Sequence, residues 1–170
     1  MSAKSVALIP MSLILMSATP VKESPAAEML QKLGALEGRW EGNYSWTGAR
    51  DAKGPIAAEY TYALVKGSVT EELFADGKPY MTSVYHLDGT DLRVTHFCVQ
   101  NQPRLKADRI DPAKTSAHFA FVDVTNAGPK SNFVEEITIE RPEPDRMRIE
   151  FVSKGNGPRA VQTLELKRVG

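Results

Sequence analysis

Residues 80–104 read YMTSVYHLDGTDLRVTHFCVQNQPR and contain two of the chain's three histidines together with its single cysteine. Two runs of alternating side chains, Tyr80–Leu87 and Leu92–Val99, flank the sequence Asp88-Gly89-Thr90-Asp91. An Asp-Gly pair between two such runs is a strong signal for a β-hairpin. The stretch therefore predicts two antiparallel strands joined by a tight turn, followed by a polar corner at residues 100–104.

The hairpin also predicts which side chains share a face. With two or four residues in the connection, cross-strand partners have numbers of opposite parity, so Leu87 should pair with Thr90 or Leu92. Arg93 and His86 then fall on the outer face. The face with more aliphatic surface and no full charge should point inward, and it consists of Met81, Ser83, Tyr85, Leu87, Leu92, Val94, His96 and Cys98.

The composition excludes several classes of protein. The 21 basic and 21 acidic residues give a formal net charge of zero, and no basic patch recurs at groove spacing, so we expect no nucleic-acid binding. A single cysteine excludes an internal disulfide and a multi-cysteine zinc site. The motifs of serine hydrolases, phosphate loops, dinucleotide-binding folds and zinc proteases are also missing. The length of 170 residues is typical of one domain.

The first 18 residues differ from the rest. Lys4 precedes an apolar run at residues 6–16, and small residues follow it. The run is too short to span a bilayer and has the arrangement of a secretory signal peptide. We therefore expect a signal peptide at 1–18, a linker at 19–25 and a single domain at 26–170. The mature protein would be periplasmic or secreted, without stable membrane insertion. If the run is only a peripheral tail, the protein would be cytoplasmic.

The remaining sequence predicts one short helix and about ten strands. Apolar residues at helical spacing indicate a helix over Ala26–Leu36, which we expect to be a lid or plug. The strand candidates besides the hairpin are Arg39–Trp46, Ile56–Lys66, Ser68–Ala75, Arg104–Ile110, Ser116–Val124, Phe133–Glu140, Arg146–Ser153 and Val161–Arg168. Short connections between sequential strands favour an all-β fold, an antiparallel up-and-down barrel with room for one small ligand.

Two motifs resemble those of calycins, the group of lipocalins, fatty-acid-binding proteins and nitrobindin-like barrels. Gly38-Arg39-Trp40, directly after the helix, resembles the Gly-X-Trp signature of that group. The sequence Thr95-His96-Phe97-Cys98 with Asn101-Gln102-Pro103-Arg104 is similar to a bacterial domain-of-unknown-function family of calycin-like barrels. The resemblance covers Gly38 to Arg168 and implies a fold, but no established activity.

The resemblance also implies roles for individual residues. Trp40 would close one end of the barrel by packing against a basic residue of the last strand, Arg168 or Lys167. Nitrobindin-like proteins bind haem through a histidine late in the chain, whereas the last histidine here is His118. That mode of haem ligation therefore has no matching residue.

His96 and Cys98 are the main candidates for chemistry, because they lie two apart on one strand and share a face. Such a pair can ligate a soft metal or haem, or place a base beside a thiol. A histidine hydrogen-bonded to Tyr85 or to a backbone group, beside a buried cysteine that packs as a small apolar side chain, explains the same pattern. No third metal ligand is evident, so we predict no metal site. Polar groups inside an apolar barrel can also orient a ligand, and we expect ligand contacts from all three residues.

Other residues are weaker candidates. Arg104 could bind a ligand carboxylate or phosphate at the barrel rim, or it could tie down a loop while the neighbouring amides saturate the turn. Met81, Val94 and Trp46 should line the interior. Glu71-Glu72 and Glu135-Glu136 alternate across their strands, so we interpret both pairs as surface charge rather than a catalytic carboxylate pair.

Three functions remain open. The preferred one is a non-enzymatic barrel that binds a small hydrophobic or amphipathic molecule, with no catalytic residue and no resident cofactor. The second is a haem protein or an enzyme that uses His96 inside the barrel, with Cys98 or Tyr85 as its partner. The third is a barrel with a filled core whose outer surface contacts another protein.

Overall fold

The computed structural model describes residues 23–63, 67–98 and 100–169. The expected signal peptide at 1–18 and positions 19–22 of the expected linker lie outside the described residues, as do the expected strand ends at 64–66 and 99. The elements in order are α1 (Pro25–Gly34), β1 (Gly38–Gly48), β2 (Lys53–Ala63), β3 (Ser68–Ala75), β4 (Lys78–Asp88), β5 (Asp91–Cys98), β6 (Gln102–Asp111), the 3-10 turn η2 (Pro112–Lys114), β7 (Ser116–Thr125), β8 (Val134–Glu143), β9 (Arg146–Ser153) and β10 (Ala160–Val169).

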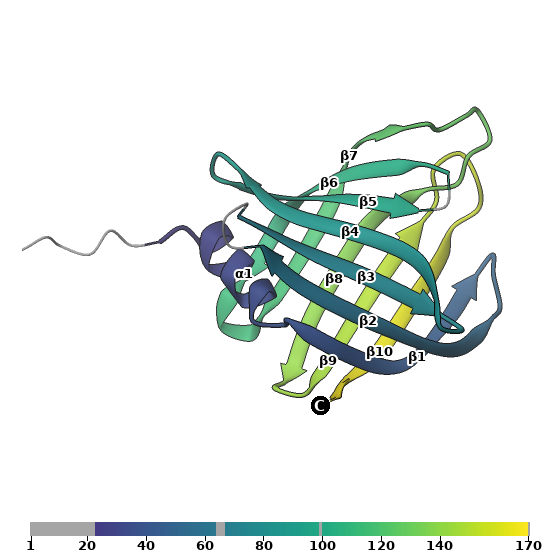
Figure 1. The fold of residues 1–170 in the computed structure, drawn as a ribbon. Helices are drawn as coiled ribbons and strands as arrows, with labels where there is room; N and C mark the ends of the chain where they lie inside the picture. The colour runs from purple at the N-terminus through teal and green to yellow at the C-terminus, as the bar shows by residue number, and fades with distance from the viewer. Residues whose placement is uncertain (1–22, 64–66, 99, 170) are drawn as a thin grey trace, which may run out of the picture.

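The ten strands close into a barrel in the order β1-β10-β9-β8-β7-β6-β5-β4-β3-β2 (Figure 1). Each strand pairs antiparallel with its neighbours in sequence, and β1 pairs with β10, from Arg39 opposite Val169 to Gly48 opposite Ala160. Since side chains alternate along each strand, one set points into the barrel and the other to solvent. The predicted antiparallel up-and-down barrel with a short helix before it is confirmed.

The β4–β5 hairpin has the predicted register. Leu87 lies opposite Leu92, and Asp88 lies opposite Asp91. Gly89 in the connection has a φ of +60°, a conformation that glycine adopts without strain. The alternate residues from Met81 to Tyr85 and from Leu92 to His96 are buried. Leu87 was expected inside but is 37% exposed, because it is the last residue of the inward face before the turn.

Helix α1 plugs one end of the barrel, where it packs on β2, β3, β4, β5 and β6 (Figure 1). The Ser24 side chain caps it by accepting from the Ala27 amide at 3.2 Å, and Pro25 occupies its first turn. Its apolar stripe of Met29, Leu30 and Leu33 is buried in the core. No helix in the described part of the chain has the length and apolar composition to cross a membrane.

Trp40 and Arg168, expected to meet at the closed end, lie together beside the helix. Trp40 is fully buried, and its indole Nε1 donates to the Leu36 carbonyl at 2.9 Å. The Arg168 guanidinium lies 4.6 Å from the centroid of the Trp40 ring. It also donates to the carbonyls of Glu37 at 2.9 Å and Ala35 at 3.0 Å. The last strand is thereby tied to the end of α1.

Candidate functional site

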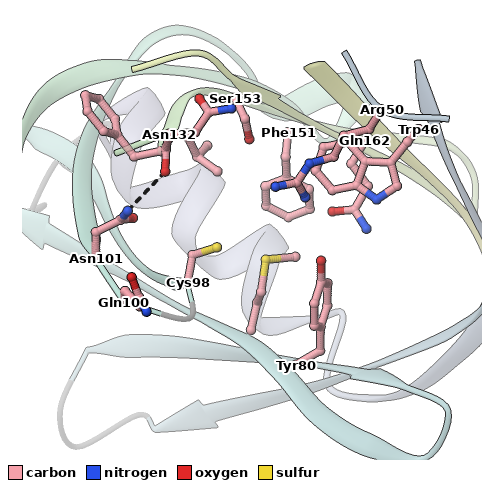
Figure 2. A pocket seen from close by; sticks show the side chains of 13 residues that line it. Trp46, Arg50, Tyr80, Cys98, Gln100, Asn101, Asn132, Phe151, Ser153 and Gln162 are labelled. Atoms are coloured by element: carbon pink, nitrogen blue, oxygen red, sulfur yellow. Dashed lines mark hydrogen bonds between the residues drawn. The ribbon is translucent and has the colours of Figure 1, made fainter. Parts of the chain in front are cut away.

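A cavity of about 230 Å³ lies at the end of the barrel opposite α1 (Figure 2). Its wall comes from the ends of six strands and from the loops that join them. Aromatic and aliphatic side chains predominate, with a few amides and one guanidinium. The lining residues are Trp46, Arg50, Tyr80, Met81, Cys98, Gln100, Asn101, Asn132, Phe133, Val134, Phe151, Ser153 and Gln162. A mostly apolar recess with a few polar groups is the usual form of a small-molecule site.

Gln162 is the most unusual group in this wall. It lies on the inward face of β10, in register with Trp46 on one side and Phe151 on the other. The side chain is only 1% exposed, and neither its amide nitrogen nor its amide oxygen has a hydrogen-bond partner among the described residues. Its amide points into the cavity toward Tyr80 (Figure 2). A buried amide without partners is costly, so a ligand that satisfies it gains affinity.

Arg50 gives the cavity a positive charge. It belongs to the loop between β1 and β2, and its guanidinium lies 4.6 Å from the centroid of the Trp46 ring. Burial raises the pKa of the Cys98 thiol and of the Tyr80 phenol, and the nearby charge of Arg50 opposes the rise in both. The cavity wall contains no Asp or Glu among the described residues. The electrostatic environment of the cavity is therefore cationic.

Two asparagines form the opposite side of the wall. The Asn101 amide nitrogen donates to the Asn132 backbone carbonyl at 3.1 Å (Figure 2). The side-chain oxygen of each asparagine is buried, with no hydrogen-bond partner within residues 23–63, 67–98 and 100–169. These two oxygens are acceptors, and they lie across the cavity from Arg50 and Gln162 (Figure 2). The site is thus polar at two positions, with an apolar centre between them.

A polar layer lies one step deeper in the barrel. Met81 and Cys98 of the wall are cross-strand partners, and Ser83 and His96 are the next inward-facing pair. Glu71 of β3 is the neighbour of Ser83, and Tyr60 of β2 is the neighbour of Glu71. These four residues form one row across β2, β3, β4 and β5, and each is at least 98% buried.

Hydrogen bonds connect the row through the Glu71 carboxyl. Tyr60 donates to it, the Ser83 hydroxyl lies 3.1 Å from Oε1, and the Tyr85 hydroxyl lies 3.4 Å from Oε2. Ser83 Oγ is also 2.9 Å from His96 Nδ1. His96 Nε2 is buried with no partner in the described structure, and the His96 ring lies 5.1 Å from that of Phe151.

Burial shifts the ionisation of this layer. It raises the pKa of the Glu71 carboxyl, against an opposing effect of the hydroxyls that donate to it. Burial also lowers the pKa of His96 to about 4, so the imidazole is neutral at pH 7. The pKa values of Tyr60 and Tyr85 are raised by burial and by the Glu71 charge, so both phenols keep their protons and act as donors.

The position of one proton decides what His96 can do. With Glu71 ionised, Ser83 donates to the carboxylate, His96 Nδ1 donates to Ser83, and Nε2 carries a free lone pair. With Glu71 protonated, the chain reverses and Nε2 carries the hydrogen. The row can thus present either an acceptor or a donor at His96 Nε2, behind the Phe151 ring.

The structure divides the expected ligand-binding residues into three groups: those that line the cavity, those buried deeper in the barrel, and Arg104, which lies outside. Trp46, Met81 and Cys98 line the cavity. Tyr85, Val94 and His96 are buried inside the barrel but do not line the cavity. Within the described residues, no three His, Cys, Asp or Glu side chains gather so as to hold a metal ion.

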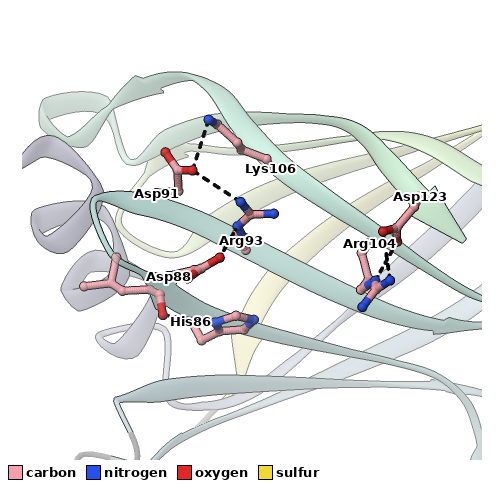
Figure 3. Close-up of polar contacts among 8 residues, drawn as sticks. His86, Asp88, Asp91, Arg93, Arg104, Lys106 and Asp123 are labelled. Carbon is pink, nitrogen blue, oxygen red and sulfur yellow. Dashed lines mark hydrogen bonds and ion pairs between the residues drawn. The ribbon is translucent and has the colours of Figure 1, made fainter.

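Arg104 does not line the cavity as a ligand-binding residue would, and it takes the structural role that the sequence analysis left open for it. It projects from the outer face of the barrel and is absent from the cavity wall. Its guanidinium makes a bidentate pair with Asp123 of β7, at 2.5 and 2.8 Å (Figure 3). The reason is parity: Leu105, next to Arg104 on β6, takes the inward position. Gln102 of the same corner accepts from Thr125 and Asn126, so the corner mainly secures the neighbouring loop.

The sequence analysis missed three residues. Glu71 was interpreted as surface charge, yet it shares the inward face of β3 with Val69 and Leu73. Gln162 likewise shares the inward face of β10 with Leu164 and Leu166. In both strands the signal was a single polar residue in register with apolar ones. Arg50 lies in a connecting loop, where periodicity carries no information.

Comparisons with known proteins identify the fold alone. No protein-family model matches the chain, and no curated protein is significantly similar to it. The crystal structure of Rv2717c from M. tuberculosis is similar with a TM-score of 0.58 and 14% identity, over 84% of this chain and 98% of that one. A protein of unknown function from the DUF3598 family of Nostoc punctiforme gives 0.57 and 10%, over 81% of this chain and 49% of that one.

Proposed function

We propose that the barrel binds one small, mostly apolar organic molecule in the cavity opposite α1. The observation that carries this proposal is the buried Gln162 amide, which points into an apolar recess with both polar atoms unpartnered in the described structure. A filled core would not place an amide there, because each unpaired buried polar group costs about 1–3 kcal/mol. A ligand with a polar group at that point would remove the cost.

The size of the cavity limits the ligand. Sites for drug-sized molecules measure roughly 300–1,000 Å³, whereas this cavity measures about 230 Å³. A single ring or a short chain fits it, and a larger molecule would have to extend through the mouth. The aromatic and aliphatic wall favours an apolar body for that molecule.

The experiment is a binding screen on the unaltered protein, one variant that fills the cavity and one control variant. Small aromatic and aliphatic probes, charged and uncharged, are tested by ligand-observed NMR. Val134→Phe places a ring where buried Val134 lines the cavity, and it should abolish binding. Val122→Phe makes the same change at a position that is 45% exposed and outside the cavity wall, and it should leave binding intact.

Two results would contradict the proposal. One is that no probe binds the unaltered protein. The other is that Val134→Phe, folded by circular dichroism, binds as well as Val122→Phe does. Native mass spectrometry of freshly purified protein adds an independent check, because a mass excess that is lost on denaturation identifies a co-purified ligand.

The second candidate is a haem protein or an enzyme that uses His96. The observation in its favour is that His96 Nε2 is buried, unpartnered in the described structure and neutral at pH 7, which suits a ligating nitrogen. Against it, His96 does not line the cavity and packs against Phe151. Haem titration decides the matter: a Soret band that disappears in His96→Ala would favour this candidate over simple ligand binding.

A further inference from the structure

We infer that the ligand of this cavity is a small organic anion, an apolar body carrying one carboxylate that Arg50 and Gln162 bind together. This inference rests on the proposed function and specifies the class of molecule. It comes from the distribution of charge and of unused hydrogen-bonding groups around the cavity, which the following paragraphs take in turn.

Arg50 lacks the partner that most of the other arginines have. Arg39, Arg93, Arg104, Arg146 and Arg148 each pair with a carboxylate of the chain. Among the described residues, Arg50 has no carboxylate within ion-pair distance, and its recorded contact is with the face of Trp46. Stacking on a ring leaves the guanidinium edge and its N–H donors available.

The guanidinium is directed at the cavity and not only at bulk solvent. Arg50 belongs to the cavity wall, and Figure 2 shows it beside Gln162 and Trp46. Its charge acts on Cys98 and Tyr80, which lie across the cavity in β5 and β4. A carboxylate in the mouth would be the counterion that the described wall does not supply, and arginine can bind a carboxylate through two parallel hydrogen bonds.

Gln162 supplies a second, shorter-range contact for the same group. Its amide nitrogen is a donor with no partner in the described structure, and Gln162 is the cross-strand partner of Trp46, the ring on which Arg50 stacks. A carboxylate has two oxygens and about four acceptor positions, so it can accept from both residues at once. An uncharged amide could satisfy Gln162 equally well, but it would leave the Arg50 charge without a counterion.

The rest of the wall requires that the anion be small and largely apolar. Trp46, Phe133 and Phe151 present aromatic surface, and Met81 and Val134 present aliphatic surface. An inorganic anion would leave this surface uncovered, and a volume of about 230 Å³ accommodates one aromatic ring or a short aliphatic chain. An aromatic or short aliphatic monocarboxylate fits both parts of the site.

The test compares benzoate with benzamide, which have nearly the same shape and differ in charge. Isothermal titration calorimetry at low salt is done on the unaltered protein, Arg50→Gln and Arg159→Gln. Arg159 is the matched control: it is exposed, its carbonyl accepts from Ala49 next to Arg50, and it does not line the cavity. The two variants therefore remove the same charge from neighbouring loops.

We expect benzoate to bind at least tenfold more tightly than benzamide, because hydrogen bonds between two charged groups are stronger than those between a charged and a neutral group. Arg50→Gln should abolish the preference, and Arg159→Gln should keep it. Gln162→Leu should weaken both ligands. Added salt should reduce benzoate binding alone, because the guanidinium is accessible to solvent.

Three outcomes would overturn the inference. The inference fails if benzamide binds as well as benzoate, or if the preference for benzoate survives Arg50→Gln. In either case the Arg50 charge has no role in binding, and the proposed function stands without the inference. If uncharged probes bind and every acid fails, the same conclusion follows. If no probe of either kind binds, and Val134→Phe behaves like the unaltered protein, the proposed function fails together with the inference.

Discussion

The two ends of the barrel contain the same pair of side chains in different surroundings. At each end a tryptophan of β1 has an arginine stacked 4.6 Å from its ring centroid, Arg168 on Trp40 and Arg50 on Trp46. At the closed end, the backbone carbonyls around α1 accept from both Trp40 and Arg168. At the open end, the same pair faces a cavity in which the Gln162 amide has no hydrogen-bond partner among the described residues.

The difference shows that one chemical motif can serve stability or binding according to what surrounds it. Side chains that donate hydrogen bonds to backbone carbonyls stabilise the fold, because the carbonyls at a helix C-terminus need partners. Donors that face an open recess remain available to a ligand. Each prediction below tests this division between the two ends, from the largest expected effect to the smallest.

The two tryptophans should differ most in their contribution to stability. Trp40→Ala removes a fully buried indole and its hydrogen bond to Leu36, so we expect a loss of about 3–5 kcal/mol in the free energy of unfolding. Trp46→Ala removes a ring at the edge of an existing cavity, and we expect a loss of about 1–2 kcal/mol. Urea unfolding measures both. Equal losses would mean that the open end is as much a part of the core as the closed end.

The polar layer between the ends should make stability depend on pH. His96 has a pKa of about 4 in the folded protein, against 6.5 when exposed, so the unfolded chain binds more protons between these values. The contribution of neutral His96 to the free energy of unfolding is present above pH 6.5 and is lost as the pH falls toward 4, a change of about 3 kcal/mol. Chemical unfolding at pH 7, 6, 5 and 4 should show the unaltered protein losing stability relative to His96→Asn by this amount, a comparison in which the titration of Glu71 is common to both proteins.

Glu71 should act in the opposite direction. Burial raises its folded pKa, so the contribution of the protonated carboxyl is fully present below its unfolded pKa and is lost as the pH rises through the folded value. The free energy of unfolding of Glu71→Gln should therefore increase, relative to that of the unaltered protein, as the pH rises. If the relative stability of the two proteins does not change between pH 4 and 8, the Glu71 carboxyl has the same pKa in the folded and unfolded protein, and burial does not raise it.

The two arginines should differ less than the tryptophans. Arg168→Ala loses the stacking on Trp40 and two hydrogen bonds to the end of α1, which together should cost about 1–2 kcal/mol. Arg50→Ala should cost less than about 0.5 kcal/mol, as for most surface changes. Thermal unfolding compares the two variants directly. A larger loss for Arg50→Ala would show that the open-end arginine is structural.

The smallest effect should be on the reactivity of the single cysteine. Cys98 lines the cavity, and burial raises the pKa of its thiol, so alkylation by iodoacetamide should be slower than in the unfolded chain. A saturating cavity ligand should slow it further. The rate is followed by mass spectrometry, with protein in denaturant as the reference. An unchanged rate with a ligand bound would place that ligand away from Cys98.

The fold could be predicted from the sequence because its signals are local. Alternation together with Gly, Pro and Asp residues at the turns marked the strands, the Asp88-Gly89 pair fixed the parity of the hairpin, and that parity placed His96 inside. The sequence could not decide between the two roles expected for Arg104, because its side of the strand depends on the tight turn at Cys98 and Asn101. The register of a strand after such a corner is determined by tertiary packing, and the local sequence does not predict it.

The candidate site was less accessible to prediction. Cys98, Met81 and Trp46 could be assigned to the interior by periodicity, but the cavity itself depends on how the ends of six strands and their loops come together. The cation of the site lies in a loop, and its effect depends on Trp46, which holds it over the cavity. Such a contact follows from tertiary packing alone.

The closing pair of strands has a consequence for how the protein folds. In the finished barrel each of the ten described strands has two neighbours, so none of them is an edge strand over its whole length. Until β10 reaches β1, however, both strands flanking the gap are open edges, and they come from opposite ends of the domain. Aggregation during refolding should therefore depend on this last pairing, and a circular permutant that joins Val169 to Glu23, so that α1 still precedes β1, should refold with less loss at high protein concentration.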